Sequence, residues 1–371
     1  MDQMQSENEI AEVVRGANGP LQVRGGGTRT VGRPVTGEVL DVSGLSGVTL
    51  YEPGALTIVA QAGTPVSEIE AALAAENQRL AFEPYDLSGM LGSSGASTIG
   101  GVVATNASGP RRIMAGAARD FALGVRFVDG AGRVIKNGGR VMKNVTGYDL
   151  VKLMCGSRGT LGVLTEVSLK VLPGVETTQT LVLPVADAAQ AVAAMSRALG
   201  SPYEVSGAAR VGGDVWLRLE GFGVSVSYRA DALRALLSEF GSAQVQDVDW
   251  TTVRDAVPLH GADAVWRISV KPGDAPAVLA VASAGCDALL DWGGGLIWIG
   301  QSGGAPQDTH AALQACTAAL GGHATLIKGA EDLRASVPVF QPEPRPVADL
   351  TAALRAQFDP RGILNPGLMA A

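Results

Sequence analysis

Two glycine-rich segments carry the residues that could hold a phosphorylated ligand. The first spans residues 23–29 (VRGGGTR) and the second spans residues 98–112 (TIGGVVATNASGPRR). Glycines let a backbone approach a ligand closely and present N–H groups with no side chain in front of them. Main-chain N–H groups that point into one concavity form a nest for an anion, the usual way to hold a phosphate. Two such segments in one domain predict a diphosphate held from two sides, and therefore a dinucleotide.

The first segment also has a simpler interpretation. A run of three glycines is often a plain connector, so residues 25–27 alone leave that alternative open. The flanking residues favour a ligand, because a β-branched strand precedes them and Arg24, Thr28 and Arg29 offer donors that suit phosphate. The turn at residues 63–65 is explained equally well by simple helix entry.

Familiar nucleotide and metal motifs are missing from the sequence. There is no GxGxxG after a strand, no GxxxxGK[ST] and no HExxH, which argues against a Rossmann NAD site, a P-loop and a zinc protease. The three histidines, His260, His310 and His323, are far apart in the chain. A structural role is the better interpretation of each, and we expect no metal site.

Composition limits the class of protein. The chain has 371 residues, enough for two domains, with 46% hydrophobic and 18% charged residues. A net charge of −7 argues against non-specific nucleic-acid binding. The three cysteines form no CxxC pair, and the acidic N-terminus is unlike a signal peptide. We therefore expect a cytoplasmic protein with no membrane span, which is soluble or peripheral to a membrane through a partner.

The elements that must position the glycine segments belong to an α+β domain. Short apolar runs bounded by Gly, Pro or Thr predict strands. Ser67 and Glu70 form a capping-box pattern at the start of a helix over residues 65–80. Long glycine loops between these elements are unlike a doubly wound sheet. The strands are expected at residues 21–24, 39–42, 57–61, 99–104, 123–128 and 163–171.

The pattern changes after Pro173. A two-residue turn, Gly212-Gly213, joins two strands and predicts a hairpin. The surrounding order is β-α-β-β-α-β, the ferredoxin-like signature. A strand–helix–strand group over residues 265–328 and a proline-rich return linker over residues 330–346 follow. The elements of the ferredoxin-like part are expected at residues 180–184, 187–199, 204–211, 215–220, 231–240 and 244–248, and a last helix is expected at 347–358.

A third polar region lies between residues 119 and 165. It begins with a predicted hairpin and continues with Lys143, Asn144, Tyr148 and Asp149 before another glycine loop. Their spacing alone does not show that these residues are functional. Asp149 is equally well explained as the cap of a short helix through residue 153.

Together these segments resemble the FAD-binding domain of the vanillyl-alcohol oxidase / p-cresol methylhydroxylase (PCMH) superfamily. They occur in the family's order over residues 20–175 and 355–371. The resemblance implies a PCMH-type FAD-binding domain of two α+β subdomains at residues 1–175. A ferredoxin-like antiparallel α+β cap domain would follow at 176–345, with a C-terminal return to the FAD domain at 346–371. The matching motifs are VRGGGTR, AGTPVSEIE, TIGGVVATNASGPRR, RDFALGVRFVDGAGRV, KNVTGYDLVKL, GSRGTLGVLTEVSL and FDPRGILNPG.

The resemblance also implies FAD as the cofactor. The glycine segments would hold its pyrophosphate, the backbone near Val163 its adenosine or ribose end, and Asn365 its flavin, with Pro84 and Tyr85 at the ring edge. Thr28 stands where many relatives carry the histidine that binds FAD covalently, so we predict non-covalent FAD. Arg158 stands where many relatives have glutamate. The implied cofactor-binding residues are Arg24, Gly25, Gly26, Gly27, Thr28, Arg29, Pro84, Thr98, Gly100, Gly101, Ala104, Ser108, Gly109, Val163 and Asn365.

The chemistry implied by the resemblance is oxidation of a 2-hydroxy acid, here glycolate to glyoxylate, in a complex. Electrons would leave through flavin to an iron–sulfur subunit, and a homologous FAD-containing catalytic subunit would be needed, since the histidine pair of catalytic relatives is missing. The catalytic residues stay unknown. Arg267 could clamp a carboxylate or simply pack as a strand arginine, and Tyr148 and Lys143 are further candidates. The alternatives are a self-sufficient D-2-hydroxy-acid dehydrogenase and a non-catalytic scaffold subunit.

Overall fold

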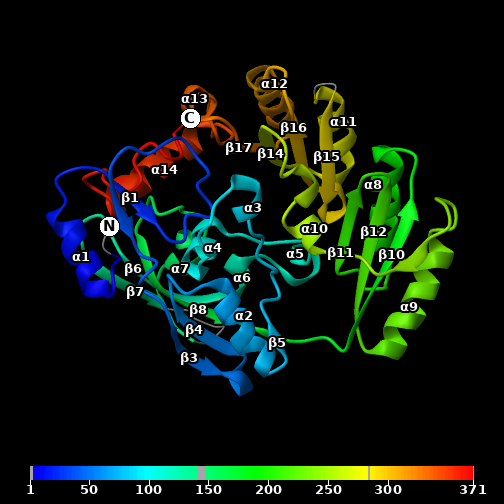
Figure 1. Ribbon diagram of the computed structural model, residues 1–371, viewed down its shortest axis with the longest axis horizontal. Coiled ribbons are helices and arrows are strands. Elements are labelled where there is room, and N and C mark those ends of the chain that lie inside the picture. The colour runs from blue at the N-terminus through cyan, green and yellow to red at the C-terminus, as the bar shows by residue number, and fades with distance from the viewer. Residues whose placement is uncertain (1–2, 141–146, 283–284, 371) are drawn as a thin grey trace. The chain divides into compact units, whose positions relative to one another are not determined.

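The computed structural model describes residues 3–140, 147–282 and 285–370. The chain forms two compact units (Figure 1). Unit 1 contains Met1–Ser108, Gly116–Gly174 and Pro342–Ala370, and unit 2 contains Gly109–Ala115 and Val175–Gln341. The domain boundaries at residues 175 and 345 stay a prediction. The sequence analysis did not foresee that Gly109–Ala115 groups with unit 2.

The centre of unit 1 is a five-stranded antiparallel sheet in the order β3-β4-β8-β6-β7. β8 lies in the middle and is buried along almost its whole length. β5 (Gln78–Arg79) and β9 (Leu172–Pro173) form a separate two-stranded antiparallel sheet with two residues in each strand. The strands of the large sheet are β3 (Val48–Glu52), β4 (Thr57–Gln61), β6 (Ala122–Val128), β7 (Val134–Gly138) and β8 (Val163–Lys170).

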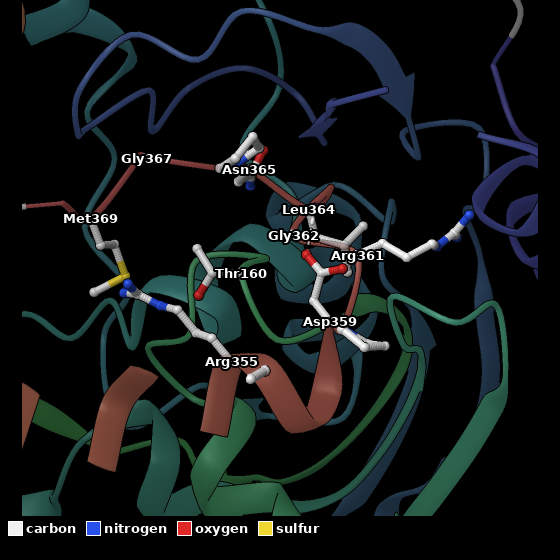
Figure 2. Close-up of a pocket in the computed structure, with 12 residues that line it drawn as sticks. Thr160, Arg355, Asp359, Arg361, Gly362, Leu364, Asn365, Gly367 and Met369 are labelled. Atoms are coloured by element: carbon white, nitrogen blue, oxygen red, sulfur yellow. Dashed lines mark hydrogen bonds between the residues drawn. The ribbon is translucent and has the colours of Figure 1, made fainter. Parts of the chain in front are cut away.

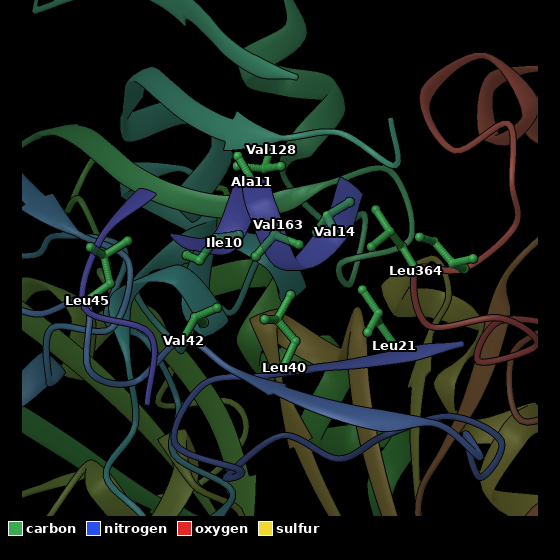
Figure 3. Close-up of a cluster of buried hydrophobic side chains, with 11 residues drawn as sticks. Ile10, Ala11, Val14, Leu21, Leu40, Val42, Leu45, Val128, Val163 and Leu364 are labelled. Atoms are coloured by element: carbon green, nitrogen blue, oxygen red, sulfur yellow. The ribbon is translucent and has the colours of Figure 1, made fainter. Parts of the chain in front are cut away.

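A second core of unit 1 brings together residues from both ends of the chain. Helix α1 (Glu7–Gly16) packs on the parallel pair β1 (Leu21–Arg24) and β2 (Glu38–Asp41), and Leu364 of the C-terminal tail bridges to β1. Figure 3 shows these side chains meeting in one cluster. The buried residues are Ile10, Ala11, Val14, Leu21, Leu40, Val42, Leu45, Val128, Val163, Ile363 and Leu364.

Short helices complete unit 1. Most of them lie in the connections between strands, where the glycine-rich segments also occur, and α14 follows the last strand near the C-terminus. Their bounds are η1 (Pro53–Ala55), α2 (Val66–Ala75), α3 (Ser88–Leu91), α4 (Ile99–Thr105), α6 (Ala118–Phe121), α7 (Leu150–Met154) and α14 (Arg345–Phe358).

The predicted strand at residues 99–104 was wrong, because this segment is helix α4. The Thr98 hydroxyl caps it by accepting from the Gly101 N–H at 3.3 Å, and Asn106 ends it in the left-handed conformation. Ile99, Val102 and Val103 are buried at helical spacing. A short apolar run fits either a strand or a helix, and here the cap and the spacing decide.

The predicted N-terminal cap of helix α2, which precedes α4 in the chain, was also wrong. α2 begins at Val66 after Pro65, with no side-chain cap from Ser67, and ends at Ala75 instead of residue 80. The capping interpretation of Asp149 is confirmed, because its carboxylate accepts from the Lys152 N–H at 3.1 Å at the start of α7.

Unit 2 is built on one antiparallel sheet of eight strands in the order β13-β10-β12-β11-β15-β16-β14-β17. The first half has β-α-β-β-α-β connectivity, and its fourth, first, third and second strands are adjacent in that order, as the ferredoxin-like prediction requires. Its elements are β10 (Thr177–Pro184), α8 (Ala188–Leu199), β11 (Gly207–Val211), β12 (Asp214–Gly221), α9 (Gly223–Leu236) and β13 (Gln244–Gln246).

The second half of this sheet repeats the same connectivity and the same strand order, which the sequence analysis missed. The two halves join where β11 pairs with β15. Its elements are β14 (Ala264–Ser269), α11 (Ala275–Val281), β15 (Cys286–Asp291), β16 (Leu296–Gln301), α12 (Pro306–Ala319) and β17 (His323–Lys328). The remaining elements of unit 2 are α5 (Arg112–Ala115), α10 (Thr251–Arg254), η2 (Val257–Leu259), η3 (Pro272–Asp274), η4 (Trp292–Gly294) and α13 (Glu331–Ser336).

Helix α9 starts eight residues earlier than the predicted 231–240, at Gly223. Its buried stripe contains Arg229, while Val224 and Tyr228 are exposed. A buried charge and exposed apolar residues hide the helical period that sequence reasoning relies on.

The C-terminal tail is held to unit 1 through Arg361. Its guanidinium donates to the carbonyl oxygens of Val14, Arg15 and Ala17 at the end of α1, and to that of Gly130 in the turn after β6. Carbonyl groups at a helix C-terminus lack intrahelical partners and favour a cation. Arg361 therefore ties the tail, the first helix and the β6–β7 turn together.

We expect the substitution Arg361→Ala to lower the free energy of unfolding by about 2 kcal/mol, because hydrogen bonds made by a charged group are each worth about 1.5–3 kcal/mol and this one is partly exposed. Urea unfolding followed by far-UV circular dichroism measures the change. Arg345→Ala, at the exposed start of α14, is the matched control and should change it by less than about 0.5 kcal/mol. Equal values for the two variants would contradict the role of Arg361.

Glu7 links α1 to the central sheet. Its carboxylate accepts two hydrogen bonds from Arg126 of β6, one of them at 3.1 Å, and one from the Thr165 hydroxyl of β8 at 2.6 Å. Burial by itself raises the pKa of the Glu7 carboxyl. The hydrogen bonds from Arg126 and Thr165 and the charge of Arg126 together lower this pKa by more than burial raises it, so the net pKa is below its ordinary value.

A depressed pKa means that the ionised carboxylate stabilises the fold above about pH 5 and that this stabilisation is lost as pH falls through the folded-state pKa. We therefore expect Glu7→Gln to lower the free energy of unfolding at pH 7 and to reduce its loss between about pH 5 and pH 3. Urea unfolding at several pH values tests this, with the exposed Glu12→Gln variant as control. An unchanged pH dependence in Glu7→Gln would refute the assignment.

Candidate functional site

The two glycine-rich segments touch through their main chains in unit 1. A Cβ atom built on Gly26 would lie 1.6 Å from the carbonyl oxygen of Ala96, and one on Gly95 would lie 1.8 Å from that of Gly26. A Cβ on Gly25 would lie 2.6 Å from the Thr98 hydroxyl. No side chain fits at these positions, so glycine is required for the two loops to meet.

The turn at residues 63–65 holds the second segment in place. The Ile99 N–H donates to Thr64 O at 2.9 Å and the Val66 N–H donates to Ser97 O at 2.8 Å. The Gly100 N–H donates to Ala62 O at 2.8 Å, and a Cβ on Gly100 would lie 2.7 Å from Ala62. Gly100 is therefore explained by close packing, and the turn has a structural role beyond helix entry.

Arg29 lies between the two segments. Its guanidinium donates to the Ser97 hydroxyl at 2.7 Å and to the carbonyl oxygen of Tyr85 at 2.5 Å, and it lies 5.8 Å from the centre of the Tyr85 ring. A Cβ on Gly101 would be 3.9 Å from this group. A guanidinium beside the first turn of α4 adds positive charge to the positive end of a helix, and a bound anion would offset both. This arrangement fits the pyrophosphate of a dinucleotide.

Asn365 connects the C-terminal tail to the first glycine segment. Its side-chain oxygen accepts from the Val23 N–H at 2.8 Å, and its side-chain N–H donates to the Arg158 carbonyl at 2.9 Å. Its backbone N–H donates to Leu21 O at 2.9 Å. The residue is buried and has a left-handed φ of 43°. Asn365 therefore sets the position of the strand end that leads into the first glycine segment.

The loop at residues 156–160 holds the end of α4. The Gly156 N–H donates to Val103 O at 3.1 Å, and the Arg158 N–H donates to Ala104 O at 2.8 Å. Arg158 has a left-handed backbone conformation, with φ 52°. This conformation is uncommon for arginine and equally so for the glutamate that many relatives carry at this position. The Ser157 hydroxyl is buried, and among the described residues it has no hydrogen-bond partner.

The other predicted cofactor residues have different surroundings. Val163 contributes its side chain to the core beneath α1, so only its backbone could face a ligand. The Ser108 hydroxyl donates to Asn106 O at 3.1 Å and accepts from the Ala118 N–H at 2.9 Å. Gly109 belongs to unit 2. The remaining ones, Arg24, Gly27, Thr28, Pro84 and Tyr85, lie in unit 1 with the glycine segments.

A cavity of about 450 Å³ lies beside Asn365 in unit 1. Figure 2 shows Thr160, Arg355, Asp359 and Met369 around the same space. One Asp359 carboxylate oxygen accepts from the Leu364 N–H at 2.7 Å, and the other is buried with no hydrogen-bond partner in the described part of the chain. This lining suits a polar group more than an apolar one.

The candidate catalytic residues lie in different parts of the chain, and their roles stay predictions. Arg267 lies in unit 2, and the Tyr148 side chain is 89% exposed in unit 1. Lys143 and Asn144 lie outside the described residues. No group of three or more His, Cys, Asp or Glu side chains suited to a metal ion occurs among the residues described.

Histidine and cysteine chemistry is also unsupported. Nδ1 of the buried His310 accepts from Trp266 Nε1 at 3.1 Å, and burial lowers the pKa of this imidazole. Nε2 of His260 lies 3.0 Å from the carbonyl oxygen of Asp255. Burial raises the pKa of the Cys155 thiol to about 11, which makes it a poor nucleophile.

Sequence reasoning missed Gly95, Ala96 and Ser97, which make the closest contacts to the first segment. Their signal was present in the run LGSSGAST that leads into Thr98. It lies in a loop before the helix, and its contacts are with residues far away in the sequence.

Comparison with known proteins decides the family. A protein-family model described as an FAD binding domain matches residues 2–138. The glycolate oxidase subunit GlcE of Escherichia coli (strain K12) is 38% identical over 355 residues, which cover 95% of this chain and 93% of that protein. The chain belongs to the GlcE family. FAD is therefore its cofactor, and its relatives are FAD-linked oxidoreductases.

Other relatives of this GlcE family member share only part of its length. A D-lactate dehydrogenase of Anaerostipes hadrus is 32% identical over 185 residues, 48% of this chain and 37% of that protein. The glycolate oxidase subunit GlcD of Bacillus subtilis (strain 168) is 36% identical over 165 residues, 44% of this chain and 34% of that protein. The chain thus aligns with well under half the length of these two proteins.

A solved structure supports the fold of the whole chain. An alkyldihydroxyacetonephosphate synthase matches with a TM-score of 0.71 and 16% identity, over 98% of this chain and 74% of that protein. With the mixed helices and antiparallel sheets of the two units, this confirms the predicted α+β, PCMH-type fold class.

We expect Gly26→Ala to reduce the FAD content of the purified protein by at least about tenfold, because the new methyl group would push the first segment away from Ala96 and open the cradle. The ratio of flavin absorbance to protein absorbance measures this. Gly19→Ala, where a Cβ meets nothing within 4 Å, is the matched control. Full FAD content in both variants would show that the contact is not needed for FAD.

Proposed function

We propose that this chain is the FAD-binding subunit of a glycolate oxidase complex that oxidises glycolate, a 2-hydroxy acid, to glyoxylate. The observation that carries the proposal is the 38% identity to GlcE over 95% of the chain, since an alignment of this length includes both units. The same oxidation is consistent with the shorter matches to GlcD and to D-lactate dehydrogenase.

The FAD site of this proposal lies at the meeting point of the two glycine segments. Gly25, Gly26 and Arg29 would face the pyrophosphate from one side, and Thr98 and Gly101 from the other. The contact between Gly26 and Ala96 and the position of the Arg29 guanidinium support this assignment. FAD supplies the two-electron acceptor for the substrate when it is bound. Asn365 acts from behind the first segment, as a positioning residue.

We propose that FAD is bound without a covalent link. Thr28 follows the three glycines, is almost fully buried, and its hydroxyl accepts from Arg29 Nη1 at 3.2 Å. A threonine hydroxyl cannot form the histidine–flavin bond of the covalent relatives.

Two partners complete the proposal. Oxidation of a 2-hydroxy acid removes a hydride equivalent from carbon and a proton from the hydroxyl group, and the proton needs a base. His310 and His260 have structural contacts, so we assign turnover to a homologous FAD-containing catalytic subunit of the GlcD kind. Three cysteines are too few for a four-cysteine iron–sulfur site, so the electron relay would belong to an iron–sulfur subunit.

A cytoplasmic location, with peripheral attachment to the inner membrane through these partners, belongs to the same proposal. Within residues 3–140, 147–282 and 285–370, no helix has the length and apolar character needed to cross a bilayer.

The similarity to D-lactate dehydrogenases favours a second candidate, a self-sufficient FAD-dependent D-2-hydroxy-acid dehydrogenase. The two candidates differ in what the isolated chain does with substrate. Glycolate or D-lactate added without oxygen would bleach the flavin of a self-sufficient enzyme within its turnover time.

We expect the purified chain to be yellow, to release free FAD into the supernatant on acid precipitation, and to keep its flavin colour with anaerobic glycolate until the catalytic subunit is added. Visible spectra before and after each step measure this. Flavin that stays in the pellet would refute non-covalent binding, and bleaching of the chain alone would favour the self-sufficient enzyme. A colourless chain whose loss still abolishes complex activity would favour the scaffold alternative.

A further inference from the structure

Arg267 and neighbouring aromatic side chains lie on the face of the unit 2 sheet opposite to the one that packs on α12, and this face is called the arginine face. Trp266 of β14 is fully buried and donates to His310 of α12, so it faces the helices. Successive strand residues point to opposite faces, so Arg267 lies on the other face. Arg267 pairs in register with Trp298 of β16 and with Thr325 of β17, which places these three residues together.

Two guanidinium groups on the arginine face lie against one indole ring, and both arginines and the tryptophan are half-buried. The Cζ atom of Arg267 is 5.0 Å from the centre of the Trp292 ring and 5.7 Å from that of Trp298. The Cζ atom of Arg112 is 4.6 Å from the centre of the Trp292 ring. These distances are within the range of cation–π contact. The indole therefore brings two arginines from distant parts of the sequence to one place.

The indole is held firmly. Trp292 is left-handed with φ 54°, a conformation that a non-glycine residue keeps only where its surroundings impose it. The Asp291 carboxylate accepts from the Trp292 N–H at 2.7 Å, and Trp292 Nε1 donates to Gly109 O at 3.0 Å. Strain of this kind is found most often at ligand sites and active sites.

The segment that supplies Arg112 is anchored as well. The neighbouring Arg111 forms a two-point ion pair with Glu220 of β12, with Nε–Oε2 at 2.9 Å and Nη2–Oε1 at 3.0 Å, and both side chains are largely buried. Arg112 is therefore presented to the arginine face by a fixed backbone, which reduces the entropy cost of binding a ligand there.

His323 lies at the edge of the same face. It pairs in register with Ser269, two residues beyond Arg267, so its side chain is on the arginine side. Loss of hydration lowers the pKa of this imidazole, and the positive charges of Arg267 and Arg112 lower it further. Both arginines therefore act on His323, which places the three side chains in one neighbourhood of unit 2.

Like charges held close together favour an anion between them. Arg112 and Arg267 contribute two positive charges, and the buried Asp291 contributes one negative charge. A planar guanidinium matches a carboxylate with two parallel hydrogen bonds, and an indole supplies a flat floor. We infer that the half-buried Arg112, Arg267 and Trp292 form a binding site for a small carboxylate on the arginine face of unit 2, with His323 at its edge. The choice of a hydroxy-acid-like ligand rests on the proposed function.

Oxalate is a suitable probe because it is a planar carboxylate with no C–H bond to oxidise. Isothermal titration of the full-length chain at constant ionic strength should give weaker binding in Arg112→Gln and Arg267→Gln, with a Kd raised roughly 10- to 100-fold. The Kd of Arg267→Lys should lie between those of these variants and that of the wild type, because lysine keeps the positive charge and loses the planar pair of donors. Arg197→Gln, on the exposed surface of α8, is the matched control and should not change the Kd.

Unchanged flavin content and thermal unfolding temperature in each variant show that the fold is intact. Oxalate binding that is absent in the wild type, or equal in the wild type and both glutamine variants, would overturn the site. Sulfate binding with the same affinity would overturn the carboxylate assignment. The flavin release and bleaching tests do not depend on these arginines, so a chain that binds oxalate here and takes no part in glycolate oxidation would refute only the proposed function.

Discussion

The arrangement of unit 1 depends on one steric constraint, the main-chain contact between the two glycine-rich segments. Gly26 and Gly95 approach each other so closely that a Cβ atom on either would overlap a carbonyl oxygen of the opposite loop. This contact places Arg29, Thr98 and the first turn of α4 around one small volume. The proposed FAD site of the GlcE family member would therefore be formed by backbone packing, and its positive charge would come from Arg29 and a set of N–H groups.

The C-terminal tail holds this contact in place. Asn365 binds the strand that leads into the first segment, and Arg361 binds the end of α1. Leu364, between them, packs into the same core as Ile10 and Val163. Because the tail contacts residues more than three hundred positions away, its loss would affect the proposed cofactor site from a distant part of the sequence.

Unit 2 uses the same fold twice. Each half carries two helices of its own, and the two halves join into one sheet where β11 pairs with β15. Arg111–Ala115 belongs to this unit although it follows directly on the second glycine segment. A single stretch of sequence thus contains Thr98 and Gly101 of the proposed cofactor site and Arg112, which lies against the indole of Trp292.

The sequence by itself determined the family, the cofactor and most strands and helices, because glycine spacing, capping residues and apolar periods are local signals. The Asp149 cap and the first ferredoxin-like repeat were readable in this way, and the α4 segment was misread because seven residues with two adjacent valines fit either element. Only the tertiary structure decided that Gly95 and Ala96 meet Gly26, that Asn365 supports a loop, and that Arg112, Arg267 and Trp292 come together. These contacts join distant residues, and the packing that creates them leaves no periodic trace in the sequence.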